Sequence, residues 1–176
     1  MEVELIETQR LRGERISESH WQLWLNMGSN AEVMATLGGT WNQEKAWEKM
    51  KWNCEQWECY RHGQWVFFEK ETGTFVGRGG IRRVTVNRNE EVELGYALMP
   101  KFWGKGLAVE IGKKILSIAF DQFCYPSMVC YTLVTNQSSE RVMQKIGFSF
   151  EENIMHAGMP HVLYRYRNPK LNPTFV

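Results

Sequence analysis

The chain has 176 residues, 43% of them hydrophobic and 13% aromatic, which suffices for a folded core, so we expect a single domain over residues 1–176. The 21 Lys and Arg residues against 20 Asp and Glu give a formal net charge of +1, which argues against a nucleic-acid partner. No apolar run approaches the ~20 residues of a membrane span, and residues 1–10 lack an apolar signal segment, so we expect a cytoplasmic protein with no membrane partner.

The first predicted elements are a strand and a helix. Residues 5–12 favour a strand that begins and ends near leucines. Ser19 and Gln22 have the spacing of a capping box, in which the two side chains satisfy free backbone N–H groups at a helix start. This spacing predicts a helix that continues to Gly28.

Two further helices are expected before the central strands. Asn30 is a favourable cap for a short helix that would end at Gly38 and Gly39. Residues 43–60 predict a longer helix because their apolar residues recur at helical spacing. This apolar stripe consists of Trp47, Met50, Cys54 and Trp57.

The middle of the chain predicts an antiparallel meander of three strands. These strands are expected at residues 64–70, 75–86 and 91–98. Residues 71–73 and 87–89 contain the Gly and Asn residues typical of the hairpin turns between such strands.

A glycine-rich turn at residues 103–108 separates the meander from the second half of the chain. Residues 109–121 then predict a helix with a buried face, and residues 128–134 predict a buried strand. Because a whole helix separates this strand from the one at residues 91–98, we expect the two strands to be parallel neighbours.

The last predicted elements are a short helix and two strands. Residues 138–146 favour the helix, and Gly147 stands where a helix commonly ends in a left-handed glycine. Residues 148–166 favour two short strands around a turn.

The glycine-rich turn predicts an anion site. The first N–H groups of a helix have no partner within the helix, and the helix dipole favours negative charge there. Gly104 and Gly106 remove the Cβ atoms that would hold a phosphate away, and Lys105 adds a positive charge. We therefore expect a phosphate-bearing ligand at this helix start.

Three ordered motifs resemble those of one enzyme superfamily. Residues 93–110, ELGYALMPKFWGKGLAVE, are similar to the central motif of the GNAT superfamily of acyl-CoA-dependent N-acetyltransferases. They look most like the RimJ/RimL branch of ribosomal-protein N-terminal acetyltransferases. Residues 136–148 resemble the Asn-x-x-Ser segment of that branch, which closes on Lys-x-Gly-Phe, and residues 7–11 and 75–81 match its opening and one of its strands.

The resemblance implies the GNAT acyl-CoA N-acyltransferase fold, of the α/β class. Such a fold has a single mixed, mostly antiparallel sheet of about seven strands, flanked by helices and splayed between strands four and five. Residues 91–98 would be the fourth strand. Trp103 stands where the superfamily signature has Gln or Arg, which leaves phosphate binding mainly to backbone N–H groups and Lys105.

The resemblance also implies acetyl transfer from acetyl-CoA, as co-substrate, to a primary amine by direct attack in a ternary complex. The pantetheine arm would lie beside the fourth strand, and a backbone N–H near Leu98 would polarise the thioester carbonyl. The residues expected to bind the cofactor are Tyr96, Ala97, Leu98, Trp103, Gly104, Lys105, Gly106, Leu107, Ala108, Val109, Asn136 and Ser139.

Three residues are candidates for catalysis. Ser139 would donate a proton or hydrogen bond to the leaving thiolate, or else simply cap a helix. Asn136 would orient coenzyme A or substrate, or else form a turn. Glu93 would be the general base, or else a structural carboxylate paired with Arg82 or Arg83.

Four other residues are weaker candidates. His156 and His161 could act as bases, although solvated surface histidines are the expected interpretation. Trp41 could line the acceptor cleft, although core packing is the expected role of most tryptophans. Glu110 favours the helix dipole and is expected to be structural.

Some alternatives remain open at this level. A non-catalytic acyl-CoA-binding sensor or assembly module of the same fold would need the glycine turn but neither Ser139 nor Glu93. A P-loop is excluded because Lys105 precedes Gly106 and no hydroxyl residue follows. The four cysteines lack C-x-x-C spacing, so we expect reduced thiols and no metal. The acceptor could be a protein N-terminus or a small molecule, and the protein a monomer or a homodimer.

Overall fold

A mixed sheet of eight strands organises residues 3–171, the part of the chain that the computed structural model describes. Every neighbouring pair is antiparallel except β5 and β6, which are parallel, so the predicted mostly antiparallel sheet is confirmed. The strand order is β1-β2-β3-β4-β5-β6-β8-β7. The strands are β1 (Leu5–Glu7), β2 (Leu11–Arg15), β3 (Gln64–Glu69), β4 (Phe75–Val86), β5 (Asn89–Leu98), β6 (Ser127–Leu133), β7 (Ser149–His156) and β8 (Met159–Arg167).

The eighth strand arises because residues 5–12 form β1 and the start of β2 instead of one strand, so the prediction of about seven strands is slightly low. Thr8 makes the turn between them. Its N–H donates to the carbonyl of Leu11, at 2.9 Å, and its hydroxyl accepts from the N–H of Leu11, at 3.0 Å. A Thr side chain that takes a nearby N–H can turn the chain without Gly or Pro.

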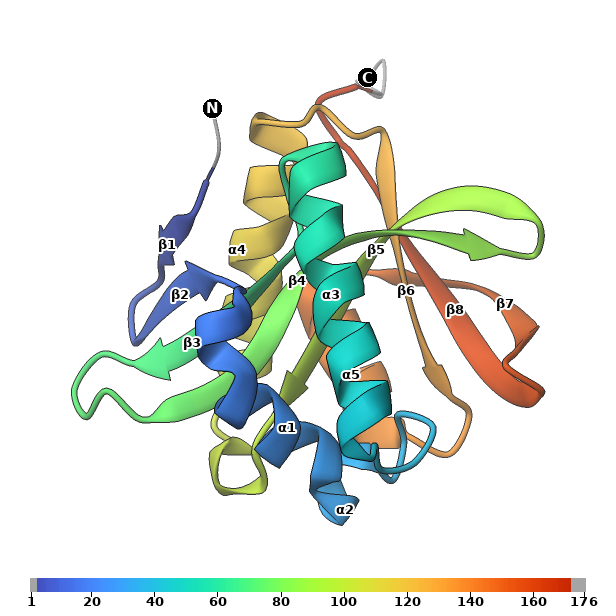
Figure 1. The fold of residues 1–176 in the computed structure, drawn as a ribbon. Coiled ribbons are helices and arrows are strands. Elements are labelled where there is room, and N and C mark those ends of the chain that lie inside the picture. Colours follow the sequence, from blue (N-terminus) through green and yellow to red (C-terminus); the bar gives the residue numbers. More distant parts are fainter. Residues whose placement is uncertain (1–2, 172–176) are drawn as a thin grey trace.

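The helices cover both faces of the sheet. Helices α1 (Trp21–Ser29), α2 (Ala31–Met34) and α3 (Gln43–Tyr60) lie on one face, and α4 (Leu107–Asp121) and α5 (Gln137–Ile146) lie on the other (Figure 1). Two 3-10 turns, η1 (Glu18–His20) and η2 (Pro100–Phe102), precede α1 and α4. No helix among residues 3–171 is long and apolar enough to cross a membrane.

The predicted helix starts are correct at α2 and α3 but wrong at α1. Asn30 caps α2 by accepting from the N–H of Val33, at 3.0 Å, although α2 ends before Gly38. The capping box before α1 belongs to Ser17 and His20, not to Ser19 and Gln22. The N–H of Ser17 donates to Nδ1 of His20, at 3.1 Å, so an imidazole takes the place that Glu or Gln usually fills.

The two parallel strands diverge, as the resemblance implies. β5 is paired with β4 from Asn89 to Leu98, and β6 is paired with β8 along its length. Between β5 and β6 there is only one register position, Glu93 opposite Val129. The sheet is therefore open at the ends of these strands, where η2, α4 and α5 begin.

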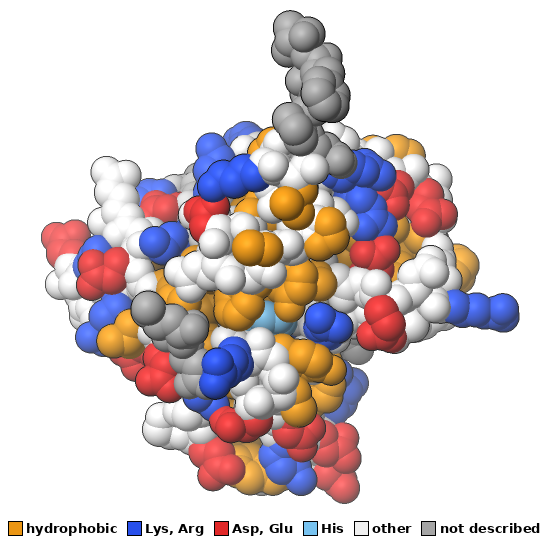
Figure 2. All heavy atoms as spheres, turned by 90° about the horizontal axis from the view of Figure 1, so that it is seen from above, with side chains coloured by type: hydrophobic (Ala, Val, Ile, Leu, Met, Phe, Trp, Pro, Cys, Tyr) orange, Lys and Arg blue, Asp and Glu red, His pale blue; other side chains and the backbone are white. Residues whose placement is uncertain are grey.

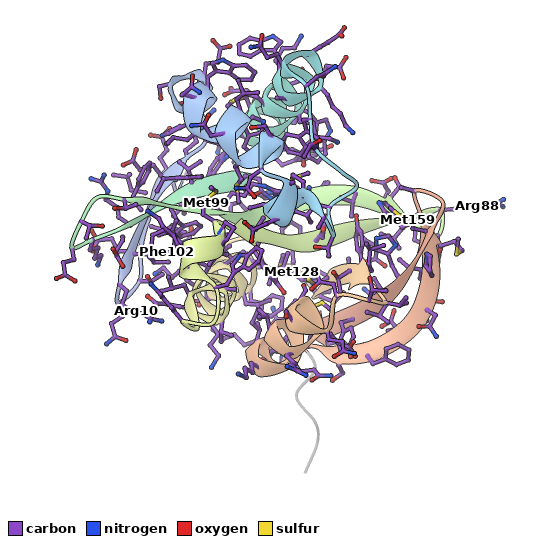
Figure 3. All side chains as sticks on the ribbon, turned by 90° about the horizontal axis from the view of Figure 1, so that it is seen from below. Arg10, Arg88, Met99, Phe102, Met128 and Met159 are labelled. Atoms are coloured by element: carbon purple, nitrogen blue, oxygen red, sulfur yellow. The ribbon has the colours of Figure 1, made fainter. Side chains whose placement is uncertain are left out.

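A two-residue turn sets the register of β4 and β5. Asn87 and Arg88 have φ angles of 48° and 67°, and Val86 pairs with Asn89. A two-residue hairpin turn whose twist matches that of the two strands requires positive φ at both of its residues. Figure 3 shows Arg88 at the tip of this hairpin, pointing away from the molecule.

Four of the eight tryptophans lie in the core, which confirms the expected role for these four, whereas Trp47, Trp52 and Trp103 are exposed. Trp24, Trp57 and Trp65 are at most 2% exposed. The indole of Trp24 donates to the carbonyl of Ala46, at 2.9 Å, and that of Trp57 to the carbonyl of Gln64, at 3.0 Å. At the end of the molecule where α3 and α4 finish, further hydrophobic side chains gather, with charged side chains around them (Figure 2).

An ionic clamp joins the β1–β2 turn to the start of α4. One oxygen of Glu110 accepts from the hydroxyl of Thr8, at 2.6 Å, and from the N–H of Arg10, at 2.8 Å. Its other oxygen accepts from Nε of Arg10, at 2.7 Å, while Nη1 of Arg10 donates to the carbonyl of Lys105, at 2.9 Å. Burial raises the pKa of Glu110, but these hydrogen bonds outweigh burial, so its pKa lies below the ordinary value.

We predict that Glu110→Gln lowers the free energy of unfolding by about 1–2 kcal/mol at pH 7, because charge-assisted hydrogen bonds become neutral ones. Because the pKa of Glu110 is lower in the folded state than in the unfolded state, its carboxylate stabilises the fold at pH values above the ordinary carboxylate pKa of about 4.3. This stabilisation is lost as the pH falls through the pKa that Glu110 has in the folded protein. The difference between wild type and variant in urea unfolding should therefore shrink in acid. Glu71→Gln, at an exposed turn, is the control. An equal difference at all pH values would contradict the clamp.

Candidate functional site

A cavity of about 560 Å³ occupies the opening between β5 and β6. Small-molecule sites usually measure about 300–1,000 Å³. Every residue expected from the sequence to bind the cofactor or act in catalysis lines this cavity, except Lys105. The lining also includes residues that sequence reasoning missed, namely Arg78 and Arg82 on β4, Glu32 and Thr36 near α2, Tyr131 and Thr132 on β6, and Arg141 and Lys145 on α5.

The glycine turn forms one end of the cavity, as the sequence predicts. Gly104 and Gly106 have φ angles of 73° and 77°, a left-handed region that side chains rarely adopt. A Cβ at Gly104 would meet nothing within 4 Å, so this glycine faces open space. Met99 and Phe102 mark the segment that leads from β5 into the turn (Figure 3).

Helix α4 begins at Leu107, two residues earlier than predicted. The N–H of Glu110 donates to the carbonyl of Gly106, at 3.1 Å, as the first hydrogen bond of the helix. The N–H groups of Leu107, Ala108 and Val109 therefore have no acceptor within the helix. These donors suit the pyrophosphate of coenzyme A, because the bare glycines let a phosphate approach them.

Two basic residues of α5 also line the cavity. Arg141 and Lys145 line the cavity and are four residues apart, which places them on one side of the helix. The spacing of these two basic residues is the signal in the sequence that could have pointed to them. Lys105, the predicted cation, lies outside the lining, and its Nζ is 5.4 Å from the centre of the Phe102 ring.

The free edge of β5 presents backbone hydrogen-bonding groups to the cavity. The N–H of Met99 donates to the carbonyl of Val76 on β4, at 2.8 Å. Because hydrogen-bonded pairs alternate along antiparallel strands, the polar groups of Tyr96 and Leu98 point away from β4, toward β6. Trp103 takes one of them, since its indole donates to the carbonyl of Leu98, at 2.7 Å. The N–H groups of Tyr96 and Leu98 lie on the same edge.

A hydroxyl pair connects β5 to α5 across the cavity. The phenol oxygen of Tyr96 lies 2.9 Å from Oγ of Ser139 and 3.1 Å from the Ser139 carbonyl. Burial raises the pKa of Tyr96 above its ordinary value, so the phenol keeps its proton. Ser139 is not the cap of α5, because the side chain of Asn136 accepts from the N–H of Ser139, at 3.1 Å.

Asn136 is therefore held by the protein at both ends of its amide. Besides capping α5, its nitrogen donates to the hydroxyl of Thr36 beyond α2, at 3.0 Å. The turn-forming role that the sequence left open is present, and the residue still lines the cavity.

Glu93 is buried on the other side of the opening and pairs with Arg82, one of the two partners considered from the sequence. Nη2 of Arg82 donates to Oε1 of Glu93, at 2.7 Å, and lies 2.6 Å from Oε2. The second contact lacks hydrogen-bond geometry, so Oε2 has no hydrogen-bond partner among the described residues. A buried carboxylate oxygen of this kind can accept a proton or an ammonium N–H.

The expectation for two nearby histidines is wrong, whereas the expected core packing of Trp41 is confirmed. His161 is 7% exposed, and His156 is half-buried beside it with 5.4 Å between ring centres, so neither is a solvated surface histidine. Burial and the neighbouring His161 lower the pKa of His156. Trp41 lies outside the cavity lining and packs on Trp24, with 5.3 Å between ring centres.

Comparison with known proteins identifies the family. The model of the acetyltransferase (GNAT) domain matches residues 10–149. The chain belongs to the GNAT acetyltransferase family. It is therefore an acyltransferase with the fold that the sequence resemblance implies, and enzymes of this family use acetyl-CoA.

Individual relatives agree with this GNAT assignment. The FsC-acetyl coenzyme A-N(2)-transacetylase of Aspergillus fumigatus is 26% identical over 161 residues, which cover 86% of this chain and 67% of that protein. A GNAT-family acetyltransferase structure from Bordetella pertussis shares the fold, with a TM-score of 0.81, 20% identity, and coverage of 92% and 98% of the two chains. RimL, a ribosomal L7/L12 alpha-N-protein acetyltransferase solved with coenzyme A, has a TM-score of 0.79, 18% identity, and coverage of 93% and 98%.

We predict that Asn136→Ala lowers the free energy of unfolding of this GNAT enzyme by about 1–2 kcal/mol, because it removes the cap of α5 and the link to Thr36. Urea unfolding measures the loss. Asn136→Asp is the matched control, since it keeps the cap acceptor but loses the donor to Thr36, and it should cost less. Equal losses in both variants would show that the cap contributes nothing.

Proposed function

We propose that this chain transfers an acetyl group from acetyl-CoA to a primary amine, a small-molecule amine or a protein N-terminal amine, by direct attack within a single domain. The observation that carries the proposal is the continuity of the cavity, which joins the free N–H groups of α4 to the buried carboxylate of Glu93. The N-acetyltransferase relatives and the RimL structure support the same reaction class.

The chain would hold coenzyme A by backbone contacts. The N–H groups of Leu107 to Val109, with Arg141 and Lys145 beside them, would bind the phosphates. The free edge of β5 would bind the pantetheine amides as a neighbouring strand does. When bound, acetyl-CoA supplies the activated acetyl group as a thioester.

Glu93 is our candidate for removing the proton of the amine. An α-amine has a pKa near 8 and a lysine amine near 10.4, so the acceptor arrives mostly as an ammonium ion. The carboxylate of Glu93, whose residue lines the cavity, is our candidate to take that proton, directly or through a water molecule. Arg82 holds the carboxylate in place through Oε1.

Ser139 and Tyr96 are our candidates for stabilising the leaving thiolate. A thiol has a pKa near 8.5, so its thiolate needs a hydrogen-bond donor more than a strong acid. When the phenol of Tyr96 donates to Oγ of Ser139, the hydroxyl proton of Ser139 is free to point at the sulfur. The N–H of Leu98, on the free edge of β5, is the candidate donor to the thioester carbonyl.

Thiol release from acetyl-CoA, measured against a panel of amines and N-terminal peptides, tests the proposal. We expect turnover with at least one amine and formation of its N-acetyl product. Binding of acetyl-CoA without turnover of any acceptor would mark the chain as the non-catalytic module considered above. Absence of binding at millimolar concentration, measured by calorimetry, would reject the site itself.

We predict that Ala108→Glu weakens coenzyme A binding at least tenfold, because it adds a negative charge where the phosphates would lie. A glutamate in the first turn of a helix does not destabilise the helix, so the fold should persist. Ala108→Gln has the same length without the charge and is the matched control, with a much smaller loss. Calorimetry gives both dissociation constants, and equal losses would place the phosphates elsewhere.

We predict that Ser139→Ala and Tyr96→Phe each lower kcat about tenfold or more. A general acid typically raises the rate 10²–10⁴-fold, and a thiolate leaving group depends less on protonation than more basic leaving groups do, so we expect the lower end of this effect. The dissociation constant of acetyl-CoA should change less than threefold. Gln137→Ala, at the first position of α5 and outside the cavity lining, is the control. Unchanged kcat in both variants would remove the hydroxyl pair from the mechanism.

A further inference from the structure

Two arginines of β4, Arg78 and Arg82, line the floor of the cavity. Because alternate residues of a strand share a face, Arg78 and Arg82 lie on the same face, with Gly80 between them. Gly95 is the partner of Gly80 on β5, so the sheet is bare between the arginines. A Cβ at Gly95 would lie 3.0 Å from Nη2 of Arg82, which places that guanidinium over the glycine.

The charges on this floor do not balance. Glu93 pairs with Arg82, as described above. Arg78 is 7% exposed, and its hydrogen bond goes from Nη1 to the neutral Oε1 of Gln64, at 3.1 Å. None of the described carboxylates lies within ion-pair distance of Arg78, and its other close neighbour is the ring of Trp24, 5.5 Å from Cζ.

Arg78 keeps its positive charge despite this environment. Burial and the charge of Arg82 lower the pKa of Arg78 to about 9, although the charge of Glu93 raises it, and Arg78 stays protonated at neutral pH. Lys49 on α3 lies close enough that burial, Arg82 and Arg78 also lower its pKa. Glu93 and the exposed Glu32 are the carboxylates that line the cavity. A buried cation without a counter-ion is costly unless a ligand supplies one.

A guanidinium has five N–H donors in a planar fork that matches the two oxygens of a carboxylate. Arg78 uses one of these donors within the protein, and its side chain lines the cavity beside the face that holds Glu93. The same floor therefore offers the carboxylate of Glu93, which is paired with Arg82, and the guanidinium of Arg78, which has no carboxylate partner among the described residues. This pairing suits a molecule that carries a cation and an anion together.

We propose that the acceptor is a small primary amine that carries a carboxylate, of the amino-acid class, and that Arg78 binds this carboxylate. The inference rests on the acetyl transfer proposed above and names its acceptor. The carboxylate of the acceptor supplies a counter-ion for Arg78, while its ammonium group faces the carboxylate of Glu93. A peptide N-terminus would bring a neutral amide to the same place and leave Arg78 unpaired.

Matched acceptors test the inference. For each of the common amino acids, kcat/KM for acetylation is compared with that of the carboxamide of the same amino acid. We expect the best amino acid to exceed its carboxamide at least tenfold. Arg78→Gln should bring this ratio close to one by lowering the rate with the acid alone. Arg83→Gln removes the same charge at another position of β4, directly after Arg82 and outside the cavity lining, and should keep the preference.

A second measurement keeps the test independent of turnover and of one variant. Calorimetry on the complex with coenzyme A should show tighter binding of the N-acetyl amino acid than of its amide, and Arg78→Lys should reduce this difference because an ammonium cannot bind a carboxylate through a fork.

Wild-type preference for amides, or equal losses for acid and amide in the variants, would overturn the inference and leave acetyl transfer intact. Failure to acetylate any amine would reject the proposed function and this inference with it.

Discussion

The incomplete pairing of β5 with β6 is the constraint on which the rest of the structure depends. Each strand is paired along its other side, so the two halves of the sheet are held apart except where Glu93 lies opposite Val129. Beyond that position the N–H groups of Tyr96 and Leu98 have no strand beside them. Buried backbone groups require hydrogen-bond partners, so an extended ligand with amide groups can complete the sheet there.

Both ends of the opening favour anions, but by different means. At the α4 end, backbone N–H groups and bare glycines form a donor set whose geometry does not depend on side-chain rotamers. On the β4 floor, guanidinium groups carry the charge, and the buried carboxylate of Glu93 offsets part of it. Backbone donors suit a cofactor that family members share, whereas side chains can change from one family member to another to suit different acceptors.

Local patterns were enough to predict α3, the meander and the glycine turn, because periodicity and glycine placement act over a few residues. The divergence of β5 and β6 was expected only from the family resemblance. The contact between Tyr96 and Ser139 joins residues 43 apart, and no local pattern encodes it. The alternation of side chains along β5 shows which residues share a face of the sheet but not which face that is. It therefore could not predict whether Glu93 faces Arg82. The cap at Ser17 was missed because an imidazole, not a carboxylate, completes it.

The two-residue turn at Asn87 and Arg88 constrains which sequence changes the site at the far end of the hairpin can tolerate. A slip of one residue between β4 and β5 would send every side chain of the displaced strand to the opposite face. Arg82 would then no longer reach Glu93, and the hydroxyl of Tyr96 would leave Ser139. Hairpin loops of about two to five residues all allow in-register pairing, so changes at this exposed tip leave the distant site intact only while Val86 still pairs with Asn89.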